Sequence, residues 1–181
     1  LQEIPEVECA INASPVKTDF LLSNDEQNFD VSGIYVDENF FNIFSYEFLE
    51  GNPVTVLKDK NSTVITEKIA LMLFNTTDNL LGKMISWQRG DIKRDIVISG
   101  ILKDIPSSSS EQFDFAISFA VFKDLAGSSA TWGNHQARVY LQLKEETNIS
   151  ALSDKIVDFI KSKDESSNVT LFLQKYSDAY L

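Results

Sequence analysis

Short stretches of the chain alternate apolar with polar residues, which is the spacing of half-buried β-strands. The first of these stretches is residues 7–13. Strand-forming residues between turn signals mark further predicted strands, which are residues 16–22, 29–36, 62–66, 83–88, 94–105 and 112–119. Polar turns at residues 23–26 and 90–91 separate neighbouring strands, so we expect a β-hairpin at each.

Two other stretches place apolar residues on one helical face. Residues 39–44 form the first predicted helix, with Asp37 as its N-cap. Residues 67–74 form the second, with Thr66 as its N-cap and an acidic residue in the first turn, where the helix dipole favours an anion. We expect both helices to pack on a sheet.

The last part of the chain predicts a strand, a helix and a second strand. Residues 139–143 alternate, residues 149–160 carry apolar side chains on one helical face, and residues 169–173 alternate again. A segment of about 35 residues has the length of a βαβ unit. Residues 126–136 are rich in Gly and Ser and predict a connection between two lobes.

Composition narrows the class of protein. The chain has 181 residues, 43% of them hydrophobic, and its 13 Phe, 5 Tyr and 2 Trp are typical of a folded protein. Its 27 acidic and 16 basic residues give a net charge of −11, which disfavours nucleic acid as a partner. No run reaches the roughly 18 apolar residues that a membrane-spanning helix needs.

The residues that catalysis or metal binding would require are sparse. Cys9 and His135 are the only cysteine and histidine, and no spacing typical of a metal site or a P-loop is present. Cys9 is interpreted as a small buried hydrophobic residue and His135 as a loop residue. Serines 107–110 predict a solvated loop. The adjacent acidic pairs are Asp37 with Glu38, Glu145 with Glu146, and Asp164 with Glu165. We predict no catalytic, cofactor-binding or metal-binding residues.

Several blocks together resemble one family. They are residues 33–44, 48–53, 64–74, 81–85, 97–106, 112–118, 132 and 139–143. In this order they resemble the periplasmic core domain of MacB-type and FtsX-like ABC transporter permeases, in a variant similar to those of Bacteroidetes. The resemblance covers nearly the whole chain and rests on the order of the blocks.

The resemblance implies an α+β fold of two lobes. Residues 1–36 and 135–181 would form a membrane-proximal, Porter-like α/β lobe that contains the βαβ unit, and residues 37–134 an inserted, Sabre-like mixed lobe. Both ends of the chain would lie on the same side, next to transmembrane helices of an inner-membrane permease.

The resemblance also implies a function and partners. The domain would transmit ATP-driven conformational change for export or release of a peptide, drug or lipoprotein, without being an enzyme and without a cofactor. ATP hydrolysis would belong to a separate nucleotide-binding subunit or domain. A periplasmic adaptor or other envelope protein is a further expected partner, and the intact permease is expected to be a dimer.

Three alternatives stay open. The face made by Phe40, Phe41 and Phe44 is a candidate contact for a partner or cargo if it is exposed, and a core helix if it is buried. A ligand-binding or sensor domain would have a deep apolar pocket. A carboxylate-based hydrolase would need two acidic side chains facing each other with perturbed pKa values.

Overall fold

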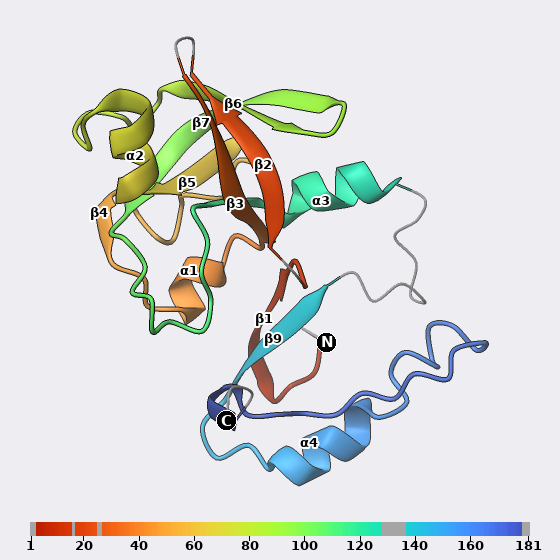
Figure 1. Cartoon of the computed structure of the whole chain (residues 1–181). Coiled ribbons are helices and arrows are strands. Elements are labelled where there is room, and N and C mark those ends of the chain that lie inside the picture. The colour runs from red at the N-terminus through yellow and green to blue at the C-terminus, as the bar shows by residue number, and fades with distance from the viewer. Residues whose placement is uncertain (1–2, 16, 25–26, 128–136, 179–181) are drawn as a thin grey trace. The chain divides into compact units, whose positions relative to one another are not determined.

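The chain forms two compact units in the computed structural model, which describes residues 3–15, 17–24, 27–127 and 137–178 (Figure 1). One unit, here called the terminal unit, comprises residues 1–10, 126–136 and 141–181. The other, the central unit, comprises residues 11–125 and 137–140. Each unit is described by itself.

The described residues contain nine strands and four α-helices. The strands are β1 (Val7–Ala13), β2 (Thr18–Ser23), β3 (Asn28–Val36), β4 (Phe48–Glu50), β5 (Ser62–Thr66), β6 (Met84–Arg89), β7 (Ile92–Leu102), β8 (Phe115–Ser118) and β9 (Arg138–Leu143). The helices are α1 (Phe40–Ile43), α2 (Glu67–Phe74), α3 (Phe119–Ala126) and α4 (Ile149–Ile156), and a 3₁₀ helix, η2, spans Tyr176–Asp178. Among the described residues, no helix is long and apolar enough to cross a membrane.

Six strands of the central unit form a closed ring. Their order is β2-β6-β7-β5-β8-β3, and β3 also pairs with β2, which completes the ring. The β5–β7 and β3–β8 pairs are parallel and the other pairs in the ring are antiparallel. Closure leaves the strands of the ring without an unpaired edge along its circumference, and encloses their inward-facing side chains.

Both predicted hairpins are confirmed. In the β2–β3 hairpin Ser23 lies opposite Asn28, and in the β6–β7 hairpin Arg89 lies opposite Ile92. The second turn contains Gly90 at a φ of +57°, a conformation that glycine adopts without steric cost. The predicted strand at residues 7–13 and the predicted helix after Thr66 are also present.

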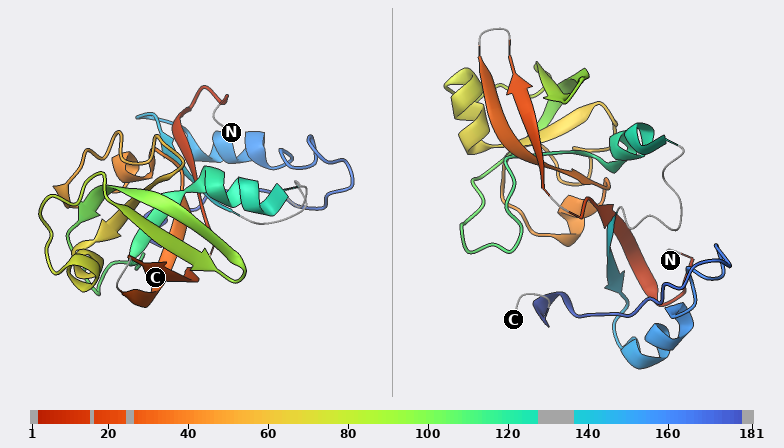
Figure 2. Two further views of the ribbon diagram at one scale, coloured as in Figure 1. Left: turned by 90° about the horizontal axis from the view of Figure 1, so that it is seen from above. Right: turned by 45° about the vertical axis from the view of Figure 1, so that its right-hand side comes forward.

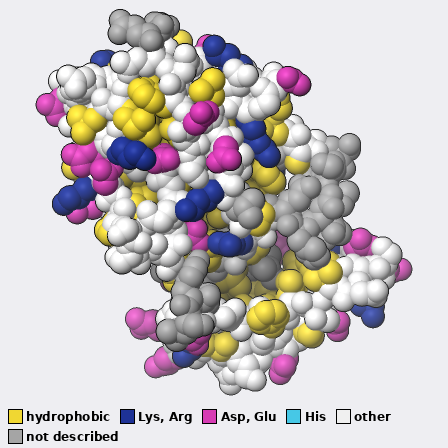
Figure 3. Space-filling model, in the orientation of Figure 1, with side chains coloured by type: hydrophobic (Ala, Val, Ile, Leu, Met, Phe, Trp, Pro, Cys, Tyr) yellow, Lys and Arg dark blue, Asp and Glu magenta, His cyan; other side chains and the backbone are white. Residues whose placement is uncertain are grey.

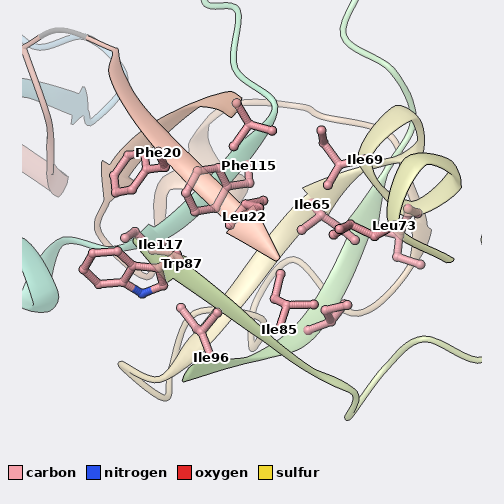
Figure 4. Packing of buried hydrophobic residues seen from close by; sticks show 14 of the residues in the cluster. Phe20, Leu22, Ile65, Ile69, Leu73, Ile85, Trp87, Ile96, Phe115 and Ile117 are labelled. Atoms are coloured by element: carbon pink, nitrogen blue, oxygen red, sulfur yellow. The ribbon is translucent and has the colours of Figure 1, made fainter. Parts of the chain in front are cut away.

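The hydrophobic core of the central unit lies inside the ring and beneath α2 (Figure 4). Its aromatic side chains meet edge to face: the ring of Phe20 lies 5.6 Å from that of Trp87 and 4.9 Å from that of Phe115. Phe115 also packs against the backbone of Gly33, where a Cβ atom would overlap its ring. The glycine at position 33 therefore makes room for the largest side chain of β8.

Two predictions in the central unit are corrected. Asp37 is not the N-cap of α1, because its carboxylate binds Asn12, and the helix begins after Asn39 and has only four residues. The strand predicted at 112–119 is confined to β8, and α3 begins at Phe119, where the sequence predicted no helix. The apolar residues of β8 are followed directly by buried apolar residues of α3. The spacing of apolar residues therefore did not show where the strand ends and the helix begins.

In the terminal unit the predicted βαβ unit is incomplete. Residues 169–173 form no strand but run as extended chain along α4, where Leu171 N donates to Val157 O and Leu173 N to Ser153 Oγ (Figure 2). Alternation describes any extended segment with one face against a neighbour, which explains the wrong assignment. Helix α4 ends at Ile156, four residues earlier than predicted, and begins with Asn148 accepting from Ala151 N.

The two units differ from the two predicted lobes in three stretches: residues 11–36 and 137–140 belong to the central unit, and residues 126–134 belong to the terminal unit. The membrane-proximal and inserted roles of the lobes stay predictions. The expected proximity of the chain ends concerns residues 1 and 181, which lie outside the described residues, as does most of the predicted connection at 126–136.

Candidate functional site

Strands β1 and β9 each contain residues of both units. In β1, residues 7–10 belong to the terminal unit and residues 11–13 to the central unit, and β9 passes from the central unit at 138–140 to the terminal unit at 141–143. The two strands are neighbours in the sheet order. The contacts that hold residues 11–14 and 138–140 within the central unit are therefore the candidate functional site, and we call them the strand anchors.

The first strand anchor joins the end of β1 to the end of β3. One oxygen of the Asp37 carboxylate accepts two hydrogen bonds from Asn12, at 2.6 Å from the backbone nitrogen and 2.7 Å from the side-chain amide. The backbone nitrogen of Asp37 donates to the Asn12 carbonyl at 2.9 Å. Ser14 and Tyr35 exchange two further bonds. Hydrogen bonds to a charged acceptor are stronger than neutral ones, so Asp37 is the main polar contact of this anchor.

The second strand anchor holds β9 through Glu111. One carboxylate oxygen of Glu111 accepts from the Arg138 guanidinium at 3.0 Å and from the Tyr140 hydroxyl at 3.2 Å. The Glu111 side chain is only 16% exposed, whereas that of Arg138 is 49% exposed. Burial, and then the neighbouring Glu111 carboxylate, raises the pKa of Tyr140, so its hydroxyl keeps the proton that it donates.

An aromatic cluster surrounds the second anchor within the central unit. Its members are Phe40, Phe41, Phe44, Tyr46, Phe48, Phe113 and Tyr140. The ring of Phe44 meets that of Tyr140 edge to face, with centroids 5.1 Å apart. Helix α1 supplies Phe40 and Phe41, and Phe44, which follows the helix, contacts β9.

The candidate contact residues on α1 lie mostly inside this cluster. Phe40 and Phe41 are buried, and Phe44 is half-buried. A docking patch would need several of these rings exposed together. Their burial favours the alternative interpretation that α1 is a core helix.

In the terminal unit, β1 and α4 are joined by an ion pair. The Lys155 ammonium contacts the carboxylate of Glu6, the residue before β1. The hydrogen bond from Lys155 is the main cause that lowers the pKa of Glu6. The carbonyl of Glu6 accepts from Lys144 N at 3.0 Å, just after β9. Within this unit, the N-terminal segment of β1 is thus tied to α4 and to the residue that follows β9.

The structure places several of the residues that were considered for catalysis. The Asp37 carboxylate is used in the first anchor, and Asp164 accepts from Ser166 in a local turn. Serines 107–110 lie in a loop, as predicted, Cys9 is half-buried, and His135 lies outside the described residues. Among the residues that are described, no group of three or more His, Cys, Asp or Glu could hold a metal ion.

Sequence reasoning missed Glu111, Arg138 and the role of Asp37. The partners are far apart in the chain, 27 residues for Glu111 with Arg138 and 25 for Asp37 with Asn12. No local spacing links such pairs.

A family model identifies the family of this chain, and solved structures show its fold. The family model of the MacB-like periplasmic core domain matches residues 1–159. A comparison with curated proteins finds no match. A domain of a putative permease from Porphyromonas gingivalis has a similar structure, with a TM-score of 0.71, 20% identity, and coverage of 98% of this chain and 83% of that one.

Two further solved structures are similar. The periplasmic region of MacB from Actinobacillus actinomycetemcomitans gives a TM-score of 0.65 at 13% identity, covering 89% of this chain and 69% of that one. The extracellular domain of the noncanonic ABC-type transporter YknZ from Gram-positive bacteria gives 0.67 at 13% identity, covering 96% and 84%. At these identities the structural matches show the fold alone.

Proposed function

Because the chain belongs to the family of MacB-like periplasmic core domains, and is thus a periplasmic domain of an ABC transporter permease, we propose that it transmits ATP-driven conformational change for export or release of a substrate. The substrate class is a peptide, drug or lipoprotein. ATP is hydrolysed by a separate nucleotide-binding subunit or domain, and this domain contributes no catalytic residue and no cofactor. The intact permease acts as a dimer and engages a periplasmic adaptor or other envelope protein.

The observation that supports transmission is the pair of strand anchors. A strand that transmits movement must be held firmly at both ends. Otherwise local motion of the strand absorbs the displacement of one end, and the other end does not move. In the central unit, β1 is held by Asp37 and β9 by Glu111, each through two side-chain hydrogen bonds. A bond to a charged group contributes roughly 1.5–3 kcal/mol, well above the thermal energy of about 0.6 kcal/mol.

Within the terminal unit, other contacts hold the residues next to β1 and β9. Glu6 contacts Lys155 of α4 and accepts from Lys144 N after β9. This unit contains both chain ends, and in the proposed arrangement it is the Porter-like, membrane-proximal lobe. Movement of the flanking transmembrane helices enters there and passes along β1 and β9 to the central, Sabre-like unit.

The proposal is tested on the intact permease with its ATP-binding partner in lipid nanodiscs. Amide hydrogen exchange is compared between the nucleotide-free state and the state trapped with ATP and vanadate. The expected result is a change in the exchange of amides in β1, β9 and their anchors. The control is an ATP-binding partner that cannot bind nucleotide, which should abolish the change. Identical exchange across this domain in both nucleotide states would refute transmission.

A further inference from the structure

The β6–β7 hairpin of the central unit concentrates basic residues. Arg89, Lys93 and Arg94 lie within residues 89–94, in a chain with 16 basic and 27 acidic residues. All three side chains are exposed. Lys and Arg side chains are visible beside this hairpin and between it and α3 (Figure 3). Solvated basic residues need no ligand by themselves, so the arrangement of these three decides whether they form a site.

The strand register places the two arginines on one face of the hairpin and the lysine on the other. Arg94 lies opposite Trp87, and directly opposite residues of an antiparallel pair point to the same face. Arg89 is two residues from Trp87 along β6 and therefore shares that face. Trp87 is buried in the core, so the arginines continue the inward face of the ring beyond the core. Lys93 lies opposite Gln88, on the outward face.

The two arginines are close enough to hold one ligand. Diagonal neighbours across an antiparallel pair lie about 7–8 Å apart, which two long side chains can close onto a single anion. Both arginines also act on the side chain of Tyr35, in β3. Burial raises the pKa of Tyr35, whereas Arg89, as a nearby hydrogen-bond donor, and the charges of Arg89 and Arg94 act to lower it. The register and the effect on Tyr35 thus agree that the two guanidinium groups converge.

Among the described residues, no carboxylate pairs with either arginine. Neither takes part in the five ion pairs found there. The carboxylate of Asp95 contacts Ser86 on the outward face of the hairpin. The acidic residues 25–26, which the structure does not describe, follow Ser23 in the chain. Ser23 lies opposite Ser86, and β2 is antiparallel to β6, so the chain leaves β2 in the direction away from Arg89.

The Tyr35 hydroxyl provides a second observation at the same place. Its oxygen is buried and makes no well-formed hydrogen bond to the described residues. Buried polar groups usually have a partner, so this exception calls for an explanation. A guanidinium group has five N–H donors and can bond to a hydroxyl oxygen and to an anion at once. An anion that orders the Arg89 side chain would therefore complete the bond from Arg89 to Tyr35.

The charge of the pair selects the class of ligand. Two guanidinium groups carry two positive charges, and a phosphate monoester carries about −1.5 to −2 at pH 7. A carboxylate or a phosphate diester would neutralise only one of the two. We propose that Arg89 and Arg94 bind a phosphate monoester group, with Tyr35 as a positioning residue for Arg89. The proposal goes beyond transmission, because a lever made of anchored strands needs no such ligand.

The first experiment measures the binding of phenyl phosphate to the intact permease in phosphatidylcholine nanodiscs. The ATP-binding partner is left out, because its own phosphate site would compete. Dissociation constants are determined by saturation-transfer NMR for wild type, Arg89→Gln, Arg94→Gln and Lys93→Gln. The last variant is the matched control, because it removes the same charge from the outward face of the same hairpin.

Each arginine variant should weaken binding by about tenfold or more, because it removes a hydrogen bond between charged groups. Lys93→Gln should weaken it by less than about twofold, because salt screens an exposed charge that does not touch the ligand. Unchanged circular dichroism is expected for all three, since these side chains are exposed. No binding to the wild type, or an equal loss in all three variants, overturns the proposal.

Two further ligands test the class and the source of the phosphate. Diphenyl phosphate, a diester, should bind about tenfold more weakly than phenyl phosphate or worse, and equal binding would contradict the match of charges. Vesicles that contain phosphatidic acid are then added as a competitor. Displacement of phenyl phosphate assigns the group to a lipid headgroup, and an undiminished signal assigns it to a soluble molecule; either result supports the site.

The positioning role is tested with Tyr35→Phe. This variant should weaken the binding of phenyl phosphate by about threefold or more, because Arg89 loses the oxygen that orients it. The urea midpoint without phenyl phosphate should not fall, which separates positioning from a structural role. An affinity equal to that of the wild type would contradict the role of Tyr35.

Discussion

Removing the Glu111 side chain should release β9 from the central unit, and its effect can be worked out from the second anchor. Glu111→Ala deletes the acceptor of the Tyr140 hydroxyl at 3.2 Å and of the Arg138 guanidinium at 3.0 Å. The bond from Tyr140 to a largely buried carboxylate is worth about 1.5–3 kcal/mol. The ion pair adds at most about 1 kcal/mol, because Arg138 is half exposed to water. We therefore expect a loss of about 1.5–4 kcal/mol in the free energy of unfolding.

The two contributions are separated by double-mutant cycles. The coupling energy between Glu111→Ala and Tyr140→Phe should exceed that between Glu111→Ala and Arg138→Ala. Urea unfolding is followed by the fluorescence of Trp87, which is buried in the core of the central unit, in a Trp132→Phe background that leaves it as the only tryptophan. The control pair is Lys103 with Glu47, an exposed ion pair at 3.2 Å for which the coupling should be at most about 0.5 kcal/mol.

The reasoning is refuted if the Glu111–Tyr140 coupling is no larger than that of the control pair. That result would mean that β9 is held by ring packing alone, and that Glu111 has no special role in the anchor.

Three further predictions concern the same unit. Gly33→Ala should lower the free energy of unfolding by about 1–3 kcal/mol, because the new methyl group overlaps the ring of Phe115. The double variant Gly33→Ala, Phe115→Leu should lose less stability than the sum of the two single variants. Strict additivity in urea unfolding would contradict this. Tyr35→Phe should be neutral or stabilising by up to about 1 kcal/mol, since the buried Tyr35 hydroxyl makes no well-formed hydrogen bond to the described residues. The nearby Arg89 side chain acts to lower the pKa of Tyr35, which burial raises, and a clear loss in the urea midpoint would show that the contact with Arg89 stabilises the fold. The pKa of Tyr140 is raised in the folded state, so the contribution of Tyr140 to stability is complete below the unfolded pKa of about 10 and is lost as the pH rises through the folded pKa. The urea midpoint should therefore fall less steeply between about pH 9 and pH 11 for Tyr140→Phe than for wild type. Equal slopes for the two proteins would contradict this prediction.

Local patterns in the sequence predicted most of the central unit. The hairpins at residues 23–28 and 89–92 follow from turn residues between alternating strands, and α2 follows from apolar spacing after Thr66. The closed ring could not be predicted, because it depends on which distant strands pair, as β3 does with β8. Residues 169–173 show the same limit, since alternation does not reveal whether a partner strand is present.

The candidate site was less predictable than the fold. Asp37 is followed by a helix, so the sequence favoured an N-cap, whereas the folded chain brings its carboxylate to Asn12 of β1. Glu111 follows four serines in a polar loop and carries no local signal. The family resemblance, by contrast, rests on block order along the chain and was confirmed by the match over residues 1–159.

The most direct test of transmission compares hydrogen exchange in the intact permease with and without the strand anchors. Wild type and an Asp37→Ala, Glu111→Ala variant are measured in nanodiscs with the ATP-binding partner, nucleotide-free and trapped with ATP and vanadate. The account predicts that the nucleotide-dependent change appears in both units of the wild type and only in the terminal unit of the variant. A nucleotide-dependent change in the central unit that persists without the anchors, or is missing from the wild type, would contradict it.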